Sequence, residues 1–178
     1  SVMDRCNFRC VYCMPEDKFH PGFKFLPSKE RLSFDEMLRL VRIFTKLGVS
    51  KIRITGGEPL LRVNLTDFIG DLSTIDKIKD IALTTNGVLL KKYAYELKAS
   101  GLARITVSLD SIDPNEFKLM TGGRGDLDRV LNGIDEAQRA GFNDIKINAV
   151  IKKGINEKNI LKMVDYFRDQ PVILRFIE

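Results

Sequence analysis

Three cysteines stand close together near the start of the chain, at Cys6, Cys10 and Cys13, and no cysteine follows them. An odd number of cysteines cannot all pair with one another, so this group indicates a set of ligands rather than a disulfide framework. Thiolates are soft ligands that suit zinc, copper(I) or an iron–sulfur cluster. A cluster of four irons is fully ligated by four cysteines, so three would leave one iron open. An open coordination position is what distinguishes a catalytic metal from a structural one.

Two other interpretations of the cysteines stay open at this point. One is a zinc site completed by His20, the only histidine of the chain. Gaps of three and two residues without a second pair of ligands make a poor structural zinc site, however. The other is an inert group of buried cysteines.

A second run whose residue types could take part in ligand binding is TGGEP, at residues 55–59. Gly56 and Gly57 allow the backbone to approach a ligand closely. The carboxylate of Glu58 can accept a hydrogen bond from an ammonium group. Taken alone, this run is a turn at the end of a strand and has weak specificity.

The elements that must position these groups alternate along the chain. Strands are predicted over residues 1–3, 51–55, 81–85, 104–109, 145–150 and 172–177. Helix starts are predicted at Ser33 with Glu36, at Asp113 with Pro114 and at Asn156, and helix ends at Gly48, Gly101 and Gly141. Strands linked by helices make a parallel sheet, whose carboxyl ends carry the sites of α/β proteins. The cysteines follow the first predicted strand.

Apolar and polar residues alternate within the predicted strands, with Arg53, Ser108 and Lys146 on the polar face. Helices must cover the apolar face, so the polar face predicts a lumen that holds a polar, anionic ligand. This favours a curved partial barrel with fewer than eight βα units over an open doubly wound sheet. The alternative is that these strands are edges facing solvent. Three consecutive βα-linked strands are hard to reconcile with three edges.

The composition limits the class of protein. The 178 residues are 44% hydrophobic and 30% charged, with a net charge of +5. A chain of this length forms about one domain and needs no disulfide or structural metal for stability, so we expect a single domain over residues 1–178. A disordered tail and a membrane span are excluded, and the cysteines indicate a reducing compartment. Because the chain begins at Ser1 and ends on the strand-like RFIE, we expect a fragment, outside which targeting signals could lie.

The run CNFRCVYC, followed one βα unit later by TGGEP, resembles the cluster loop and glycine-rich motif of the radical S-adenosylmethionine (SAM) superfamily. The resemblance implies an α/β fold, a partial (β/α)6 TIM-like barrel of parallel strands with outer helices. It also implies a [4Fe-4S] cluster held by Cys6, Cys10 and Cys13. The open iron of that cluster chelates the amino and carboxylate groups of SAM.

A longer set of runs resembles the GTP 3',8-cyclase family of molybdenum cofactor biosynthesis within that superfamily. The runs are SVMDRCNFRCVYCMPED, FLPSKERLSF, KIRITGGEPLLR, LTTNGVLL, GLARITVSLDSID, KINAVIKKGIN and LRFIE. The resemblance implies a lyase that converts GTP to a cyclic pyranopterin precursor. A 5'-deoxyadenosyl radical made from SAM would take hydrogen from the ribose C3', and the ribose carbon would then attack C8 of the purine.

The same resemblance assigns roles to matching positions of this chain. Tyr12, Gly57 and Ser108 are assigned to SAM, and Arg53, Thr84, Lys146 and Arg175 to GTP, with Lys51 a weaker candidate. Arginine suits bidentate phosphate recognition, and lysine acts as a point charge. Arg175 also fits a solvated surface charge, because its face carries isoleucines. No general base is assigned, since the cofactor carries the hard chemistry.

The chain departs from that family in several places. Met3 stands where the family usually has threonine, which changes packing but removes no ligand. The family holds a second [4Fe-4S] cluster with three cysteines of a C-terminal extension, and no cysteine follows Cys13. An upstream arginine that contacts GTP and a SAM-contacting methionine beyond RFIE are also missing. We therefore expect residues 1–178 to bind a cluster and SAM but to be inactive on GTP alone.

The implied partners are GTP, SAM, an electron donor and the protein that completes pyranopterin formation, and a homodimer is compatible with the resemblance. We expect neither membrane nor nucleic acid as a partner, and a cytoplasmic location, or the mitochondrial matrix if the source is eukaryotic. Another radical SAM enzyme would share the cysteine spacing and GGEP. A basic, zinc-containing nucleic-acid binder should instead gather its cations and aromatics on one face. Here Lys and Arg are dispersed among 24 acidic residues.

Overall fold

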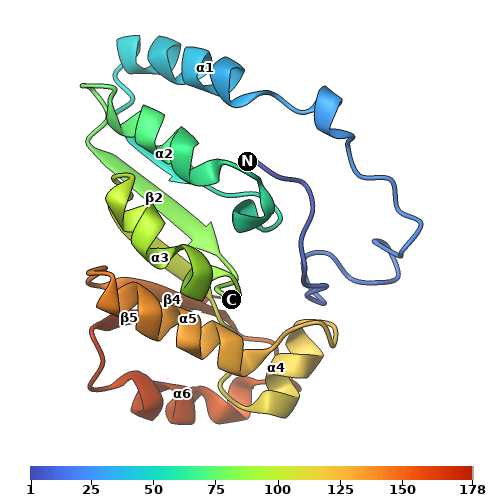
Figure 1. The fold of residues 1–178 in the computed structure, drawn as a ribbon. Helices are drawn as coiled ribbons and strands as arrows, with labels where there is room; N and C mark the ends of the chain where they lie inside the picture. The colour runs from blue at the N-terminus through green and yellow to red at the C-terminus, as the bar shows by residue number, and fades with distance from the viewer. Residues whose placement is uncertain (178) are drawn as a thin grey trace.

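In the computed structural model, which describes residues 1–177, five parallel strands form one sheet. The strands pair in chain order, from β1 to β5, so each strand neighbours the next (Figure 1). Their bounds are Lys51–Ile54 for β1, Asp80–Thr85 for β2, Arg104–Ser108 for β3, Ile145–Val150 for β4 and Val172–Ile177 for β5. Parallel strands joined by helices bring all their carboxyl ends to one edge of the sheet.

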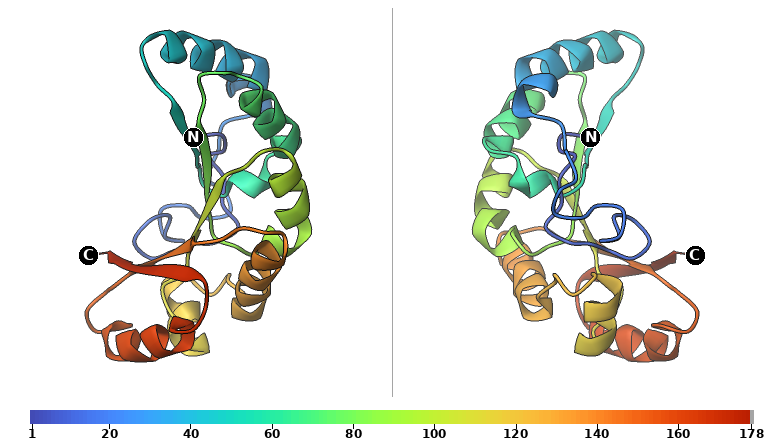
Figure 2. Two further views of the ribbon diagram at one scale, coloured as in Figure 1. Left: turned by 90° about the vertical axis from the view of Figure 1, so that its left-hand side faces the viewer. Right: turned by 90° about the vertical axis from the view of Figure 1, so that its right-hand side faces the viewer.

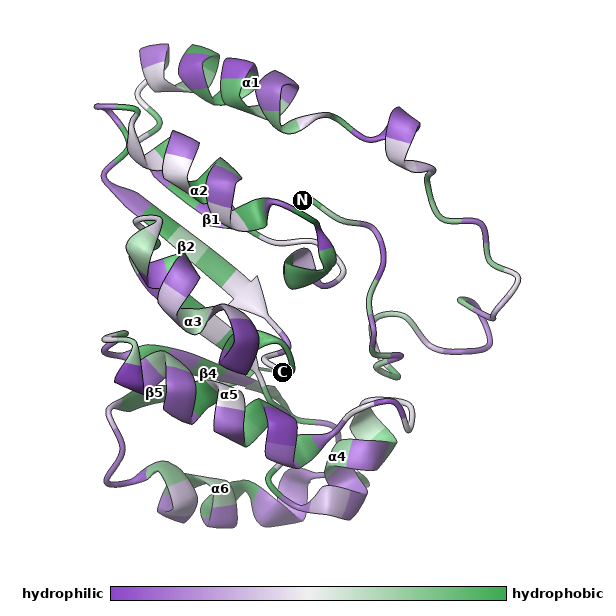
Figure 3. Cartoon of the chain, in the orientation of Figure 1, coloured by the Kyte–Doolittle hydropathy of each residue, from purple (hydrophilic) through white to green (hydrophobic). Residues whose placement is uncertain are grey.

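The helices cover one side of this sheet. They are α1 (Phe34–Lys46), α2 (Leu65–Ser73), α3 (Leu90–Ala99), α4 (Pro114–Met120), α5 (Leu127–Arg139) and α6 (Ile160–Phe167), with 3-10 turns η1 (Ser28–Glu30), η2 (Pro59–Leu61) and η3 (Glu157–Asn159). The strands follow an arc with the helices on its convex side (Figure 2). Hydrophobic and hydrophilic residues alternate along the helices, as expected when only one side of each helix is buried (Figure 3).

The helix signals of the sequence are confirmed at most positions. The Ser33 hydroxyl accepts from Glu36 N at 3.2 Å, and the Glu36 carboxylate accepts from Ser33 N at 2.7 Å, which completes a capping box. Asp113 caps α4, with Pro114 at its first position. After α1, Gly48 adopts a φ of 93°, a conformation that glycine tolerates best.

The register confirms the predicted division of the strands into two faces. Thr84 pairs with Thr106, and Thr106 with Lys146, so polar residues line up across three strands. The opposite face carries the core under the helices, including Ile54, Leu83, Ile105, Val107 and Ile147 from the strands and Leu90, Leu97, Val130 and Ile134 from α3 and α5. The polar face is therefore the concave one, and the α/β partial barrel of parallel strands with outer helices is confirmed.

One predicted strand and one predicted helix start are wrong. Residues 1–3 are extended but form no strand: Val2 N donates to Thr55 O, and Met3 O accepts from Gly57 N, both at 2.7 Å. These bonds hold the segment at the end of β1 instead of along it, so no ladder develops, and the described sheet has five strands rather than six. Asn156 does not begin an α-helix, because η3 follows it and α6 starts only at Ile160.

None of the helices within residues 1–177 combines the length and hydropathy that crossing a membrane requires.

Candidate functional site

The loop that carries the three cysteines is fixed from two sides by backbone hydrogen bonds. On one side, the turn after β1 donates to Arg5 O at 2.8 Å. On the other side, the N–H groups of Arg9 and Val11 donate to carbonyls at the end of α4, both at 3.1 Å. Within the loop, Cys13 N donates to Cys10 O at 3.0 Å. Elements far apart in the sequence therefore position the cysteines.

The two glycines of the turn after β1 permit a close approach to this loop. A Cβ atom on Gly56 would lie 2.4 Å from Met3 O, and one on Gly57 would lie 2.2 Å from Arg5 O. Both obstacles are backbone atoms, which cannot rotate away. The close approach predicted for these glycines is thus made to the cysteine loop itself, and a contact of Gly57 with SAM stays a prediction.

Glu58, next in this turn, is only 1% exposed, and its carboxylate is used inside the protein. Oε1 accepts from Leu60 N at 3.0 Å and from the Thr85 hydroxyl at 2.8 Å, and Oε2 accepts from Asn86 N at 2.7 Å. Burial raises the pKa of this carboxyl, although these bonds favour its charged form. The contacts contradict our interpretation of Glu58 as an acceptor for a ligand's ammonium group: Glu58 caps η2 and ties the turn to β2.

Asn86, just beyond β2, connects that strand to the cysteine loop. Its Nδ2 donates to Asn7 Oδ1 at 2.7 Å and to Cys6 Sγ at 3.8 Å. A second donor, Phe8 N, lies 3.4 Å from the same sulfur. The Cys6 sulfur therefore sits among N–H groups.

Arg9 stabilises the cysteine loop through hydrogen bonds to the carbonyl groups of its backbone. Its guanidinium is buried and donates to Cys6 O at 2.9 Å, to Phe8 O at 2.8 Å and to Phe19 O at 3.0 Å. These carbonyls belong to an irregular loop, which has no ladder to satisfy them. Arg9 supplies the missing donors.

Tyr12 joins the loop to the carboxyl end of β3. Its hydroxyl donates to Asp110 Oδ2 at 2.9 Å, and Asp110 Oδ1 accepts at 2.9 Å from N of Val150, the last residue of β4. Burial raises the pKa values of both Tyr12 and Asp110. Because Asp110 follows Ser108 by two residues, the structure brings two of the predicted SAM-contacting residues to one strand end.

The donor set fits a [4Fe-4S] cluster. Cys6, Cys10 and Cys13 are all free thiols on one loop. Burial raises the pKa of the Cys6 thiol, and it raises that of Cys10 to about 12. Thiols bind a metal as thiolates, so cluster binding at these cysteines releases their protons. N–H groups around a ligand sulfur, as at Cys6, are a feature of iron–sulfur sites.

The geometry gives a single zinc ion no support. Within residues 1–177, no three His, Cys, Asp or Glu side chains converge as ligands of one metal ion. A four-iron cluster binds each thiolate through a different iron, so it does not require the sulfurs to meet at a point. His20 is exposed, and its Nδ1 accepts from Gly22 N at 3.2 Å.

The concave face beside the loop carries a cation held by two hydroxyls. One terminal nitrogen of Arg53 donates to the Thr84 hydroxyl at 2.9 Å and to the Thr106 hydroxyl at 3.2 Å. Its other nitrogens make no hydrogen bond within residues 1–177 and remain available to an anion. Arg104, by contrast, is committed to an ion pair with Asp80 at the amino end of the same face.

Lys146 and Ser108 extend this polar face. Lys146 lies beside Thr106 in the register, and Ser108 lies beside Asn148. The buried Oδ1 atom of Asn148 finds no hydrogen-bond partner within the described chain. A buried polar atom without a partner is costly, and a polar ligand on this face would satisfy it.

The two remaining candidates lie at the margins. Arg175 of β5 pairs in register with Asn148, which puts it on the concave face, but it is exposed and the isoleucines of its face are exposed with it. Lys51 begins β1 at the end of the sheet away from the cysteine loop. A contact of either residue with GTP stays a prediction.

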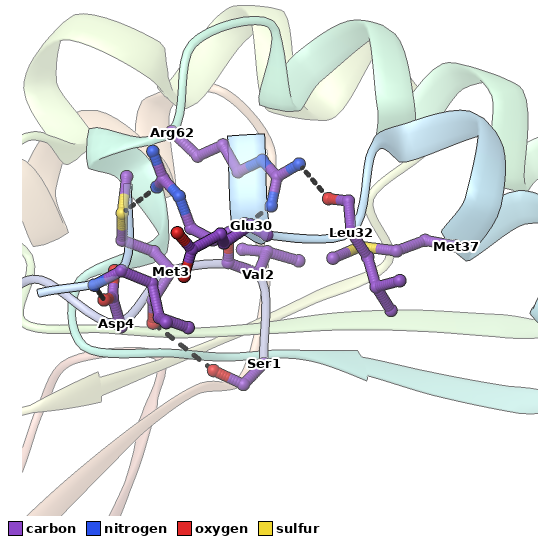
Figure 4. A pocket seen from close by; sticks show the side chains of 10 residues that line it. Ser1, Val2, Met3, Asp4, Glu30, Leu32, Met37 and Arg62 are labelled. Carbon is purple, nitrogen blue, oxygen red and sulfur yellow. Dashed lines mark hydrogen bonds between the residues drawn. The ribbon is translucent and has the colours of Figure 1, made fainter. Parts of the chain in front are cut away.

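A cavity of about 250 Å³ lies beside the segment that enters the cysteine loop (Figure 4). Arg62 spans it, donating to Val2 O at 2.7 Å and to Leu32 O at 2.6 Å. Arg31 donates to the sulfur of Met3 at 2.8 Å. Met3 is thus accommodated by a direct contact, as expected for a change that alters packing and removes no ligand.

Sequence reasoning missed several residues of the site. They are Asn7, Arg9, Asn86, Thr106 and Asp110. Asn86 and Asp110 directly follow predicted strands, at the edge where sites gather, so their positions were a usable signal. Nothing in the sequence distinguished Arg9 from the other arginines.

Comparison with known proteins agrees with this geometry. A family model described as the radical SAM superfamily matches residues 1–167. A GTP 3',8-cyclase of Xanthomonas axonopodis pv. citri (strain 306) is 50% identical over all of this chain and 53% of that protein. One of Staphylococcus haemolyticus (strain JCSC1435) is 51% identical over all of this chain and 52% of that protein. The chain thus spans about half the length of the curated relatives it matches.

Solved structures with low sequence identity share the fold. HydG, a maturase of the [FeFe]-hydrogenase, superimposes with a TM-score of 0.72 at 16% identity, over 99% of this chain and 42% of that chain. Native anSMEcpe with bound AdoMet and Cp18Cys peptide gives 0.70 at 19% identity, over 99% and 48%. These likenesses support the partial barrel.

Proposed function

This chain belongs to the radical SAM superfamily, and from that premise we propose that Cys6, Cys10 and Cys13 hold a [4Fe-4S] cluster whose open iron binds SAM. The observation that carries the proposal is the anchoring of the cysteine loop against the carboxyl ends of β1, β2 and β3. When bound and reduced, such a cluster supplies the electron that cleaves SAM to a 5'-deoxyadenosyl radical.

The residues of the chain itself would bind and orient the reactants. Ser108 would contact SAM from the end of β3, Tyr12 from the cysteine loop, and Gly57 from the turn after β1. Tyr12 is pre-positioned for this by its bond to Asp110. A side chain that is already held in place loses less conformational entropy when a ligand binds.

We propose GTP as the substrate of the whole protein, and its 3',8-cyclisation as the reaction. The support is the 50% and 51% identity to proteins named GTP 3',8-cyclase, over all of this chain. Arg53, Thr84 and Lys146 offer a cationic, hydroxyl-bearing face that suits a triphosphate.

Anaerobic reconstitution of the chain tests whether it binds the cluster and cleaves SAM. We expect about four iron and four sulfide ions per chain, together with reductive cleavage of SAM to methionine and 5'-deoxyadenosine. Zinc at one ion per chain without iron or sulfide would contradict the proposal. A cluster that forms but does not cleave SAM would contradict its SAM part alone.

Replacing Arg53 with alanine is expected to weaken GTP binding by about 10- to 100-fold, the size of one lost charge-assisted contact. Equilibrium dialysis of GTP against the cluster-loaded chain measures the change. Arg53→Lys should recover part of the affinity, because it keeps the charge and loses the fork geometry.

Arg139→Ala is the matched control, because Arg139 is 69% exposed on α5 and pairs only with Glu136 within the described chain. Equal GTP affinity in the Arg53 variant and the wild type, or an equal loss in the Arg139 variant, would remove Arg53 from the substrate site.

A further inference from the structure

We propose that Asn86 is a positioning residue for the cluster, which orients the Cys6 thiolate and raises the reduction potential of the cluster through an N–H···S hydrogen bond. The inference rests on the proposed function, because it requires a cluster on Cys6. It goes beyond that function by naming a residue, outside the cysteine loop, that controls how readily the cluster accepts its electron.

The orientation of the Asn86 amide is fixed by its neighbours. Val88 N donates to Asn86 Oδ1 at 3.2 Å, so the oxygen must face the start of α3 and the NH2 group must face the cysteine loop. There, Nδ2 donates to Asn7 Oδ1 at 2.7 Å and to Cys6 Sγ at 3.8 Å. One nitrogen with two hydrogens can serve both acceptors.

The backbone of Asn86 is fixed as well. Its N–H donates to Glu58 Oε2 at 2.7 Å, and Glu58 belongs to the turn that holds the loop at Arg5. Asn86 as a whole residue is 8% exposed, so water competes little for its amide. The donor that faces Cys6 is therefore held by three separate segments of the chain.

Such a donor has a defined physical effect. Reduction adds negative charge to the cluster and its sulfur ligands, and an N–H group beside a sulfur stabilises the more negative state. Partners that orient a ligand also contribute to metal retention, typically by 10- to 100-fold. Phe8 N contributes a second such bond, but a backbone donor cannot be removed by changing its side chain.

The test compares the reconstituted wild-type chain with Asn86→Ala and Asn86→Asp. We expect the ratio of reduced to oxidised cluster, at the wild-type midpoint potential, to fall by about three- to tenfold in Asn86→Ala, the size of one hydrogen bond. Asn86→Asp keeps an acceptor for Val88 N but faces the sulfur with a carboxylate, so its ratio should fall further. Iron loss to a chelator should accelerate by about tenfold in both.

Asn156→Ala is the matched control for simple loss of stability. Asn156 is 2% exposed and also makes three hydrogen bonds through its amide group, to Asp110 O, Val150 O and Lys152 N, but none to a cysteine. Its midpoint potential should equal that of the wild type, even if its melting temperature falls as far as that of Asn86→Ala.

An EPR-monitored redox titration separates the outcomes. An unchanged potential in both Asn86 variants, or an equal shift in Asn156→Ala, would overturn the inference while leaving the proposed function in place. A wild-type chain that takes up no cluster would overturn both.

Discussion

Replacing Cys10 with serine is expected to abolish the cluster and to lower SAM cleavage by more than about 100-fold, because loss of a ligand costs at least as much as loss of its supporting partners. A serine hydroxyl is a hard ligand that stays protonated, whereas iron–sulfur clusters require soft, anionic sulfur. The chain offers no substitute, since its only cysteines are these three. Iron and sulfide analysis, with the absorbance of the reconstituted protein, measures the loss.

His20→Ala is the control for Cys10→Ser. His20 is the only histidine of the chain and the residue that would complete a zinc site, and removing it should leave iron content and SAM cleavage unchanged. If His20→Ala lost the metal and Cys10→Ser kept it, the cysteines would not be the ligand set.

Replacing Gly57 with alanine is expected to have the next largest effect, a fall of about 6–12 °C in melting temperature together with loss of cluster binding. The new Cβ would lie 2.2 Å from Arg5 O, 2.5 Å from Arg5 C and 3.0 Å from Cys6 N. All three are backbone atoms, so the clash can be relieved only by moving the cysteine loop or the turn. Thermal unfolding and iron content after reconstitution measure the two effects.

Gly70→Ala provides the opposite expectation within the same fold. Gly70 lies inside α2, and a Cβ added there would meet nothing within 4 Å. Alanine favours helix over glycine, so the melting temperature should rise by about 2–4 °C without any change in iron content. A comparable loss of iron in Gly70→Ala and Gly57→Ala would mean that the close contact of Gly57 with the loop is not what holds the cysteines.

Much of the fold was predictable because its signals are local. A capping box such as Ser33 with Glu36 involves neighbouring residues, and the alternation around Arg53 and Lys146 follows from the two-residue period of a strand. The strand predicted at residues 1–3 failed for the opposite reason. Strand character depends on a partner along its length, and this segment meets β1 only at its end.

The candidate site divides in the same way. The cysteine spacing by itself indicated a set of metal ligands, and the polar strand face by itself placed Arg53, Ser108 and Lys146 on one side of the sheet. The GGEP motif did not reveal that Glu58 is an internal cap rather than an acceptor for a ligand, because burial is a property of the folded chain.

Only the tertiary structure decided which side chains touch the cysteine loop. Asn86 reaches Cys6 across 80 positions of sequence, and Tyr12 reaches Asp110 across 98. Such contacts depend on how neighbouring strands are registered and how their ends bend, within the few tenths of an ångström that a hydrogen bond tolerates. The sequence determines which chemical groups the chain possesses. The packing of β1, β2 and β3 side by side determines which of those groups lie against the cysteine loop.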